Sequence, residues 1–464
     1  MKNVLSKINT YIHSIINNIV SFFTRFIKGN LKTKLSYIIM GSGMFLNGQI
    51  VKGLIFLSIQ VSYIQYMVNK GIYYLQMLTT LGTKTQGEVW DESLQIFQIQ
   101  QGDNSMLLLL FGVSTVLLSI IIFGIYVWNT NIAYRNEMTI KNNKKPDSFR
   151  HEVKELFNTK FHFTVLSIPV VLTFLFTIVP LIFMILMAFT NYNRDHQPPG
   201  NLFTWVGFDN FSQVLFDNPL WSETFSRLFI WTIVWAIFAT FLNYILGMLL
   251  AILINSKGIK LKTMWRTIFV ITIAVPQFVS LLLMSKLLAD TGALNNLLLN
   301  LGIIDEHIGF LSNGSIAKVV VIVINLWVGV PYTMLITSGI LMNIPQDLYE
   351  ASKIDGASPF KQFMHITLPY MLHVTTPYLI TQFIGNINNF NVIFLLTGGG
   401  PLSLNLYQAG ETDLLVTWLY KLTVNEQNYA LASTIGIIIF VVLAFISLVA
   451  YNKSSSVQNE EDFK

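Results

Sequence analysis

Long stretches without a charged residue recur along most of the chain. Six of them, such as 104–134 and 362–410, contain at least 26 consecutive uncharged and mostly apolar residues. About 20 apolar residues in a helix are enough to cross the hydrocarbon core of a bilayer. Two shorter stretches, 53–69 and 267–285, are also apolar enough to span. The pattern therefore predicts eight membrane-spanning helices, near residues 53–69, 105–128, 163–189, 224–254, 265–289, 315–342, 374–397 and 428–451.

The composition also indicates an all-α, polytopic membrane protein, since only 11% of the residues are charged and 53% are hydrophobic. A soluble domain carries about 25% charged residues. The chain of 464 residues therefore has too little polar surface for a water-soluble fold. This excludes a cytosolic enzyme, a disordered protein and a secreted disulfide scaffold. The chain has no cysteine, which excludes disulfides, thiolate metal sites and a cysteine nucleophile.

Basic residues are distributed unevenly between the segments that separate the predicted spans. If the N-terminus is inside, the inner segments carry 21 Lys and Arg residues and the outer segments carry 4. Because cytoplasmic loops retain Lys and Arg, we expect both termini in the cytoplasm. The net charge of +5 then reflects topology and does not indicate a nucleic-acid partner. Residues 35–51 carry three Gly, Asn47 and Gln49, and we expect an interfacial or re-entrant segment there rather than a ninth span.

This topology divides the chain into four segments. They are a cytoplasmic or interfacial segment (1–52), two spans with an extracellular loop and a cytoplasmic linker (53–160), a core of six spans (161–452) and a cytoplasmic tail (453–464). Gly43 and Gly48 are spaced as in a phosphate-binding loop, but Gln49 stands where a lysine would reach the phosphates. The seven His residues form no ligand cluster. We therefore expect no catalytic residue, no metal site and no nucleotide site in this chain.

The inner segment 343–372 contains two short helical patterns joined at a glycine. Asp347 suits the first turn of a helix, and Gly356 ends that helix. Ser358, followed by proline, starts a second helix that we expect Pro369 to end. The segment is therefore predicted to form an elbow of two helices at the inner face of the membrane. On geometry alone, such a pair of helices is more often a structural bend than a docking site.

The same segment resembles the EAA loop of ABC importer permeases. Their pattern is Glu-Ala-Ala, three variable residues, Gly, nine variable residues and then Ile-x-Leu-Pro. The chain matches it at Glu350, Ala351, Gly356, Ile366, Leu368 and Pro369, with a mild departure at Ser352. The resemblance implies the type I permease fold of these importers and an elbow seated in a groove of an ATPase subunit. It implies ATPase-coupling roles for Glu350, Ala351, Ser352, Asp355, Gly356, Ile366 and Pro369.

Further segments, at 325–340, 386–401 and 411–420, make the chain similar to the MalF-type permeases of maltose and maltodextrin importers. The resemblance implies a transport subunit of the cytoplasmic membrane that is not itself an enzyme and holds no cofactor. Its partners would be a MalG-type permease, two ATPase subunits of the MalK or MsmX type that bind ATP and Mg²⁺, and an extracellular sugar-binding lipoprotein. The Gram-negative member of the family has a large external domain after its third span, where this chain has only the short loop 190–222. That difference suits a lipid-tethered binding protein of a Gram-positive cell.

Candidate sugar-binding residues lie in the predicted sixth and seventh spans. Neutral oligosaccharides are bound by amide and hydroxyl groups together with aromatic faces, and such polar groups are costly when they face lipid. The residue types alone fit sugar binding and interhelical hydrogen bonding equally well. Carried over by position, the resemblance implies a substrate site formed by Asn325, Gly329, Tyr332, Asn386 and Asn389. Gly385 replaces an aromatic residue of the family, which leaves room for a differently linked sugar such as a galacto-oligosaccharide.

Two functions of other classes remain as alternatives. An ion-coupled secondary sugar transporter would place its site on broken helices of repeated halves. The predicted spans carry no charged residue far from their ends, which disfavours it. A membrane-embedded transferase acting on lipid-linked sugars would need charged residues at the mouth of a loop. The candidates for that role are Asp305, Glu306, Glu411 and Asp413.

Overall fold

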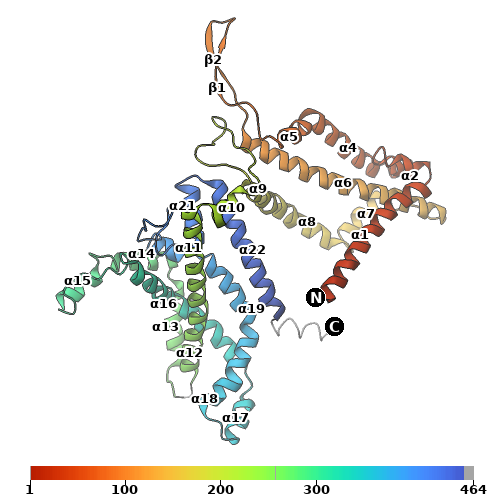
Figure 1. Ribbon diagram of the computed structural model, residues 1–464. Helices are drawn as coiled ribbons and strands as arrows, with labels where there is room; N and C mark the ends of the chain where they lie inside the picture. Colours follow the sequence, from red (N-terminus) through yellow and green to blue (C-terminus); the bar gives the residue numbers. More distant parts are fainter. Residues whose placement is uncertain (1, 257, 454–464) are drawn as a thin grey trace. The chain divides into compact units, whose positions relative to one another are not determined.

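The computed structural model describes residues 2–256 and 258–453 and is built almost entirely of helices (Figure 1). Within these residues, six helices are long and apolar enough to cross a membrane, and two bent helix pairs raise the number to eight if each pair is one span. The prediction of an all-α polytopic protein with about eight spans is therefore confirmed. The six long helices are Ile50–Met77, Ser105–Lys141, Phe161–Met187, Pro219–Asn255, Gly314–Leu341 and Tyr429–Asn452.

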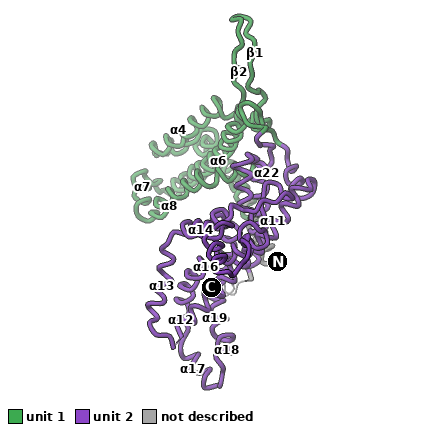
Figure 2. Tube along the Cα trace, turned by 90° about the vertical axis from the view of Figure 1, so that its left-hand side faces the viewer, with its two compact units in different colours: residues 1–186, 195–205 green, residues 187–194, 206–464 purple. Residues whose placement is uncertain are grey.

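The chain forms two compact units, which Figure 2 colours separately. Unit 1 consists of residues 1–186 and 195–205, and unit 2 consists of residues 187–194 and 206–464. The structure therefore groups residues 161–186 with unit 1, whereas the division made from the sequence began the core at residue 161.

The elements of unit 1 are α1 (Lys2–Lys28), α2 (Leu31–Leu35), α3 (Ser42–Phe45), α4 (Ile50–Tyr66), η1 (Met67–Gly71), α5 (Ile72–Met77), β1 (Gly87–Asp91), β2 (Ile96–Gln100), α6 (Ser105–Lys141), α7 (Phe149–Leu156), α8 (Phe161–Thr173), η2 (Phe174–Ile178) and α9 (Val179–Met187), where η marks a π-helical turn. Those of unit 2 are α10 (Asp209–Ser212), η3 (Gln213–Asp217), α11 (Pro219–Ile237), η4 (Phe238–Leu242), α12 (Asn243–Asn255), α13 (Lys262–Ala274), α14 (Gln277–Leu287), α15 (Ala293–Asn300), α16 (Gly314–Leu341), α17 (Gln346–Ile354), α18 (Pro359–Gln362), η5 (Phe363–Thr367), α19 (Leu368–Ile387), α20 (Phe390–Leu396), α21 (Leu415–Val424) and α22 (Tyr429–Lys453).

The fifth predicted span, 265–289, is not one straight helix. Its two halves, α13 and α14, meet at an angle of 85°. Val275 between them has an extended backbone, with φ −74° and ψ 122°, which is the conformation favoured before a proline. Pro276 therefore separates the two helices, and its effect was missed because the hydrophobic pattern continues through it.

The predicted end of a helix at Pro369 is wrong. The chain passes from α18 through η5 into α19 without a break. In η5 the Leu368 N–H bonds the Phe363 carbonyl, and Pro369 follows in the first turn of α19. A proline in a first helical turn lacks an N–H that the new helix does not need, so the helix continues. A bend of 41° occurs instead further on, between α19 and α20.

Between α1 and α4 the chain forms only the short helices α2 and α3, in agreement with the expected absence of a ninth span. Buried side chains of α6 hold this segment in place. Asn129 Oδ1 accepts a hydrogen bond from Gly41 N at 2.9 Å, and Asn136 Nδ2 donates to Gln49 Oε1 at 2.7 Å. Glu137 Oε2, also buried, accepts from the Thr33 hydroxyl at 2.7 Å. These bonds satisfy polar groups that would otherwise be unpaired in an apolar setting.

An antiparallel hairpin of β1 and β2, not predicted from the sequence, lies between the first two spans. Figure 1 shows that it extends away from the helices to which its two ends are joined. The sequence-based search looked for long apolar runs, and a strand pair of five residues each does not produce one.

In unit 2, α12 and α16 lie side by side. Gly329 of α16 permits this close approach, because a Cβ there would lie 2.5 Å from Asn243 Nδ2. The Thr337 hydroxyl also reaches the Gly247 carbonyl of α12 at 3.4 Å. Trp235 is completely buried in an apolar cluster that includes Val321 and Ile324 of α16. This packing fixes the two helices that supply much of the candidate site.

Candidate functional site

A polar cavity of about 170 Å³ lies in unit 2 among η4, α12, α14, α16, α19 and the start of α20. All five residues predicted to form the substrate site line it, although they come from two segments about 60 residues apart. The complete lining is Ala239, Thr240, Asn243, Tyr244, Gln277, Asn325, Gly329, Tyr332, Thr333, Tyr378, Leu379, Gln382, Asn386 and Asn389. None of these side chains is charged.

Asn386 and Asn389 already hold helices together in this structure. Asn386 Nδ2 donates to the Thr240 hydroxyl at 3.0 Å and so connects α19 with η4. Asn389 Oδ1 accepts from Val392 N at 3.3 Å as the N-cap of α20, and its Nδ2 donates to Asn386 Oδ1 at 3.3 Å. An amide offers two donors and two acceptor positions, so each side chain keeps hydrogen-bonding capacity for a ligand. Both structural and binding roles are therefore compatible with the geometry.

Asn243 and Asn325 are paired less completely. They are only 9% and 6% exposed, yet Asn243 Oδ1 and Asn325 Nδ2 have no hydrogen-bond partner. An unpaired buried polar atom costs about 1–3 kcal/mol. Such a cost is explained where the atom serves a ligand or a second conformation of the protein. Both residues line the cavity, which leaves an acceptor on Asn243 and a donor on Asn325 for a hydroxyl-rich ligand.

A larger and mostly apolar groove of about 650 Å³ adjoins the cavity and shares Gln277, Gly329 and Tyr332 with it. Tyr332 and Trp327 are both exposed and line the groove from α16. Aromatic rings of this kind offer flat apolar faces and, in tyrosine, a polar tip. The two hollows together combine amides, a phenol and an indole, which are the groups that bind the faces and hydroxyls of a sugar.

The sequence-based selection missed several polar residues of the cavity. Gln382 lies on the same face of α19 as Asn386, four residues before it, and Tyr378 lies four residues before Gln382. A repeat of four residues marks one side of a helix, so this polar stripe was a usable signal. Thr240 and Asn243 form a similar pair three residues apart. The other missed polar lining residues are Tyr244, Gln277 and Thr333.

The predicted elbow is present at α17 and α18. Gly356 between them has φ +76°, a left-handed conformation that L side chains rarely adopt. A Cβ there would meet nothing within 4 Å, so the requirement for glycine comes from the backbone alone. The Ser358 hydroxyl accepts from Lys361 N at 3.4 Å, which confirms the predicted N-cap.

Ser352, the departure from the family pattern, joins the two arms of the elbow. Its hydroxyl donates to the Tyr349 carbonyl at 2.9 Å and accepts from Gln362 Nε2 at 2.8 Å. Glu350, Ala351 and Asp355 are exposed, as are Gly356 and Pro369, whereas Ser352 and Ile366 are half-buried. Three large apolar side chains are also exposed on the elbow, namely Leu348, Ile354 and Phe360. The elbow therefore presents apolar side chains and charges of both signs on an internally bonded frame.

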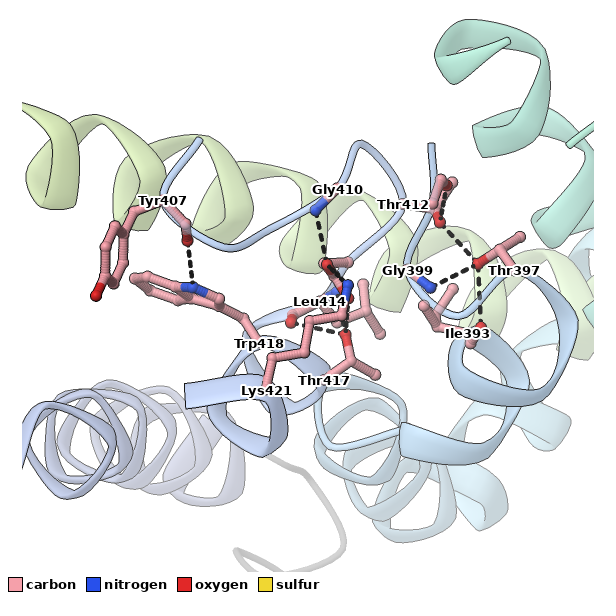
Figure 3. A network of polar contacts seen from close by, with 12 residues as sticks. Ile393, Thr397, Gly399, Tyr407, Gly410, Thr412, Leu414, Thr417, Trp418 and Lys421 are labelled. Atoms are coloured by element: carbon pink, nitrogen blue, oxygen red, sulfur yellow. Dashed lines mark hydrogen bonds and ion pairs between the residues drawn. The ribbon is translucent and has the colours of Figure 1, made fainter. Parts of the chain in front are cut away.

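A polar network fixes the segment between α20 and α21 (Figure 3). Asp413 is completely buried, and its two carboxylate oxygens accept from Gly410 N at 2.7 Å and from the Thr417 hydroxyl at 2.8 Å. Lys421 Nζ lies 2.6 Å from the same carboxylate. Nearby, the Trp418 indole N–H donates to the Tyr407 carbonyl at 2.8 Å. All of these groups are occupied in holding the segment together.

Glu411, the neighbouring carboxylate considered for a transferase, pairs with Lys318 at 2.8 Å. The hydrogen bond from Lys318 lowers the pKa of Glu411, against the opposing effect of partial burial. The Lys318 ammonium also lies 5.6 Å from the centre of the Trp231 ring. An ionised and paired carboxylate is a poor general acid, so the geometry gives no support to a transferase site here.

Comparison with known proteins places the chain among transport proteins. The family described as "Binding-protein-dependent transport system inner membrane component" matches residues 243–455. The chain is 34% identical over 428 residues to the galactooligosaccharides transport system permease protein GanP of Bacillus subtilis (strain 168), covering 91% of this chain and 97% of that protein. It is also 34% identical over 451 residues to the maltodextrin transport system permease protein MdxF of the same organism, with 94% and 98% covered.

Other similarities cover less of the chain. The maltose/maltodextrin transport system permease protein MalF of Escherichia coli (strain K12) is 34% identical over 263 residues, which are 56% of this chain and 51% of that protein. A solved bacterial ABC transporter involved in the import of the acidic polysaccharide alginate is 24% identical with a TM-score of 0.51, covering 65% of this chain and 97% of the other. This likeness supports the ABC importer permease fold. Because two full-length permease relatives are 34% identical to more than nine tenths of it, the chain belongs to the family of binding-protein-dependent transport system inner membrane components.

Proposed function

We propose that this chain is the permease subunit of an ABC importer that carries a neutral oligosaccharide across the cytoplasmic membrane. The observation that carries the proposal is the cavity in unit 2, where the five residues selected for sugar binding converge. Two amide atoms in its wall have no partner in the protein. Asn243 Oδ1 can accept a hydrogen bond from a sugar hydroxyl, and Asn325 Nδ2 can donate one. The names of the two Bacillus relatives indicate the same class of cargo.

The substrate we propose is a maltodextrin or a galacto-oligosaccharide. The cavity wall carries amides, hydroxyls and phenols and no charged side chain. A carboxylated sugar would need a positively charged partner to offset the free-energy cost of desolvating its carboxylate. An acidic polysaccharide such as alginate therefore fits this wall poorly. Uptake should be measured with maltodextrins, galacto-oligosaccharides and alginate oligomers in parallel. Uptake of the acidic oligomers alone would contradict the proposal.

The energy for transport comes, in this proposal, from partner chains. Two ATPase subunits of the MalK or MsmX type bind ATP and Mg²⁺, and one of them receives the exposed elbow at Glu350 and Phe360. A second permease of the MalG type completes the membrane pathway. The short loop 190–222 suits a sugar-binding protein tethered to lipid in a Gram-positive cell.

The coupling role of the elbow is tested by changing its hinge. Gly356→Pro should abolish uptake while the protein still inserts, because proline fixes φ near −65° and the hinge needs φ +76°. Gly356→Asn is the matched control, since asparagine tolerates the left-handed region and its Cβ meets nothing within 4 Å. Glu350→Ala should also abolish uptake by removing a charged contact with the ATPase. Normal sugar-stimulated ATP hydrolysis in Gly356→Pro and Glu350→Ala would show that the elbow does not couple the subunits.

A further inference from the structure

The β1–β2 hairpin of unit 1 carries an apolar face that the rest of the described residues of unit 1 leave open. Its register places Trp90 opposite Phe97 and Glu88 opposite Ile99, so the side chains of Trp90, Phe97 and Ile99 point to one side. The rings of Trp90 and Phe97 meet edge to face with centres 5.0 Å apart. The three side chains are 49%, 64% and 67% exposed. Adjacent exposed aromatic and aliphatic side chains form a candidate contact surface on a segment expected to lie in water outside the cell.

The hairpin has little that would stabilise it by itself. An isolated two-stranded hairpin is at best marginally stable in water. Here the opposite face is open as well, since Val89 and Ile96 are also exposed. Figure 1 shows no helix of unit 1 lying along either strand. Each strand therefore also presents an edge of backbone groups without a neighbouring strand, and such edges readily receive a partner protein.

The charges of the hairpin favour a protein partner over the lipid surface. Residues 86–100 contain Glu88, Asp91 and Glu92 and no Lys or Arg. Asp91 Oδ1 accepts from the Ser93 hydroxyl at 2.5 Å and from Ser93 N at 2.9 Å, and these bonds lower the pKa of Asp91. Asp91 is therefore ionised at neutral pH, and anionic lipid headgroups would repel it. A protein surface with an apolar patch bordered by Lys or Arg would complement it.

We propose that the face formed by Trp90, Phe97 and Ile99 docks the external sugar-binding protein that delivers the substrate. This rests on the proposed function and on the family of the chain, whose members depend on a binding protein. The external loop 190–222 is too short to form a large docking domain. The hairpin supplies an exposed aromatic anchor of the kind that dominates protein interfaces, on the segment predicted to be external.

The first test measures the affinity of the assembled importer for its binding protein. In Trp90→Ser/Phe97→Ser both anchors are removed, and we expect the Kd to rise about 10- to 100-fold. The binding-protein concentration that gives half-maximal uptake should rise by the same factor, with maximal uptake retained. The cross-strand pair Val89→Ser/Gln98→Ser on the opposite face is the matched control and should change the Kd less than twofold. Equal affinities of wild type and Trp90→Ser/Phe97→Ser would overturn the proposal.

The second test keeps the aromatic pair and therefore does not depend on the stability of that variant. The chain has no cysteine, so Ile99→Cys and Gln98→Cys each create a single labelling position on opposite faces of β2. A photo-crosslinker at position 99 should capture the binding protein at least five times more efficiently than one at position 98. Equal capture from the two positions, or capture from position 99 of lipid or of a second copy of this chain alone, would overturn the docking face.

Failure of this inference can be told apart from failure of the proposed function. If the wild-type importer takes up no oligosaccharide at any binding-protein concentration, the proposed function is wrong, and the docking proposal that rests on it is wrong as well. If the wild type imports oligosaccharide and the Trp90→Ser/Phe97→Ser variant binds and imports equally well, only the docking face is wrong.

Discussion

The cavity of unit 2 and the network around Asp413 are built from similar polar side chains but are paired to different degrees. In the network, both oxygens of Asp413 are bonded and its charge faces Lys421. In the cavity, Asn243 Oδ1 and Asn325 Nδ2 have no partner. A buried polar residue is thus a weak sign of a binding site by itself. A buried polar residue that stays unpaired beside a cavity is a stronger sign, because folding alone does not explain its cost.

The two regions also differ in what surrounds them. The network ties the segment 397–421 to α11, since Leu415 N bonds the Thr232 hydroxyl at 3.0 Å and the Trp231 indole N–H reaches the Thr412 carbonyl at 3.2 Å. The cavity instead opens beside a groove lined by Trp327 and Tyr332. We therefore expect substitutions in the network to affect folding and assembly, and substitutions in the cavity to affect transport.

The largest effect is expected from Asp413→Ala. Removing this carboxylate takes away the charged partner of the Lys421 ammonium, the acceptor of Gly410 N and one of the partners of the Thr417 hydroxyl. Breaking a buried ion pair from one side costs about 3–5 kcal/mol. The amount of assembled complex should fall sharply, with normal uptake per surviving complex. The double variant Asp413→Leu/Lys421→Met should recover part of the loss, because it removes the stranded charge. Unchanged assembly of Asp413→Ala would mean that the network does not hold the fold.

The next largest effect is expected from Asn325→Leu. Leucine is similar in size and removes an amide whose Nδ2 is unpaired, so assembly should be unchanged or slightly improved. If Asn325 binds a sugar hydroxyl, its loss costs about 1–3 kcal/mol, and uptake should fall about 10- to 100-fold. Uptake per complex and the amount of complex should be measured together. Full uptake per complex would remove Asn325 from the site.

Asn386→Leu tests a residue that is expected to act both in transport and in holding helices together. It should reduce uptake by a similar factor and also weaken assembly by about 0.5–1.5 kcal/mol, because the bond from Asn386 to Thr240 is lost. Asn389→Asp is the matched variant, since the aspartate oxygen can still cap α20 at Val392 N while the amide donor is removed. A loss of assembly in Asn386→Leu with normal uptake per complex would assign that amide a purely structural role.

The sequence predicts some features of the elbow and the cavity and does not predict others. The elbow was predictable because its signals are local, such as a serine before a proline and a glycine at a helix end. The candidate substrate residues were selected through the family pattern, and the structure brings them to one cavity. Their pairing could not be predicted, because the partner of Asn386 lies 146 residues away at Thr240.

The errors in the helix boundaries have a related cause. Pro276 and Pro369 are chemically identical, yet one separates two helices by 85° and the other lies in a continuous helix. The difference comes from the backbone before each proline, which is extended at Val275 and π-helical at η5. A single sequence does not reveal which of these two conformations the surrounding packing selects.

A smaller effect is expected from Gly329→Ala. The added Cβ would lie 2.5 Å from Asn243 Nδ2, which is the end of a flexible side chain and can move. The amide of Asn243 should then shift and narrow the cavity without unfolding α12 or α16. We expect uptake to fall about 3- to 10-fold, or roughly 1 kcal/mol, with longer oligosaccharides affected most. A control at Gly339 of the same helix, where a Cβ meets nothing within 4 Å, should transport normally. Equal losses for short and long sugars would argue against a steric effect in the cavity.

The smallest effect is expected from Glu411→Gln, next to the Asp413 network. The pair of Glu411 with Lys318 is about one third exposed on each side, at 32%, so solvent screens it and it contributes at most about 1 kcal/mol. The hydrogen bond from Lys318 holds the pKa of Glu411 below its ordinary value of 4.5, so the folded state binds the proton less readily than the unfolded chain. This stabilisation is therefore complete above that ordinary value and is lost as the pH falls through the lowered pKa.

Denaturation midpoints of the purified complex at pH 7 and pH 4 test this expectation. At pH 7 the free energy of unfolding derived from these midpoints should be higher for the wild type than for Glu411→Gln by no more than about 1 kcal/mol. This difference should shrink at pH 4, because the glutamate is then partly protonated whereas the glutamine does not titrate. A difference that grows on acidification would have the wrong sign for a lowered pKa. A loss at pH 7 as large as that of Asp413→Ala would show that the exposed pair stabilises this segment as much as the buried carboxylate does. The larger stabilising effect expected of complete burial and pairing at Asp413 would then be wrong.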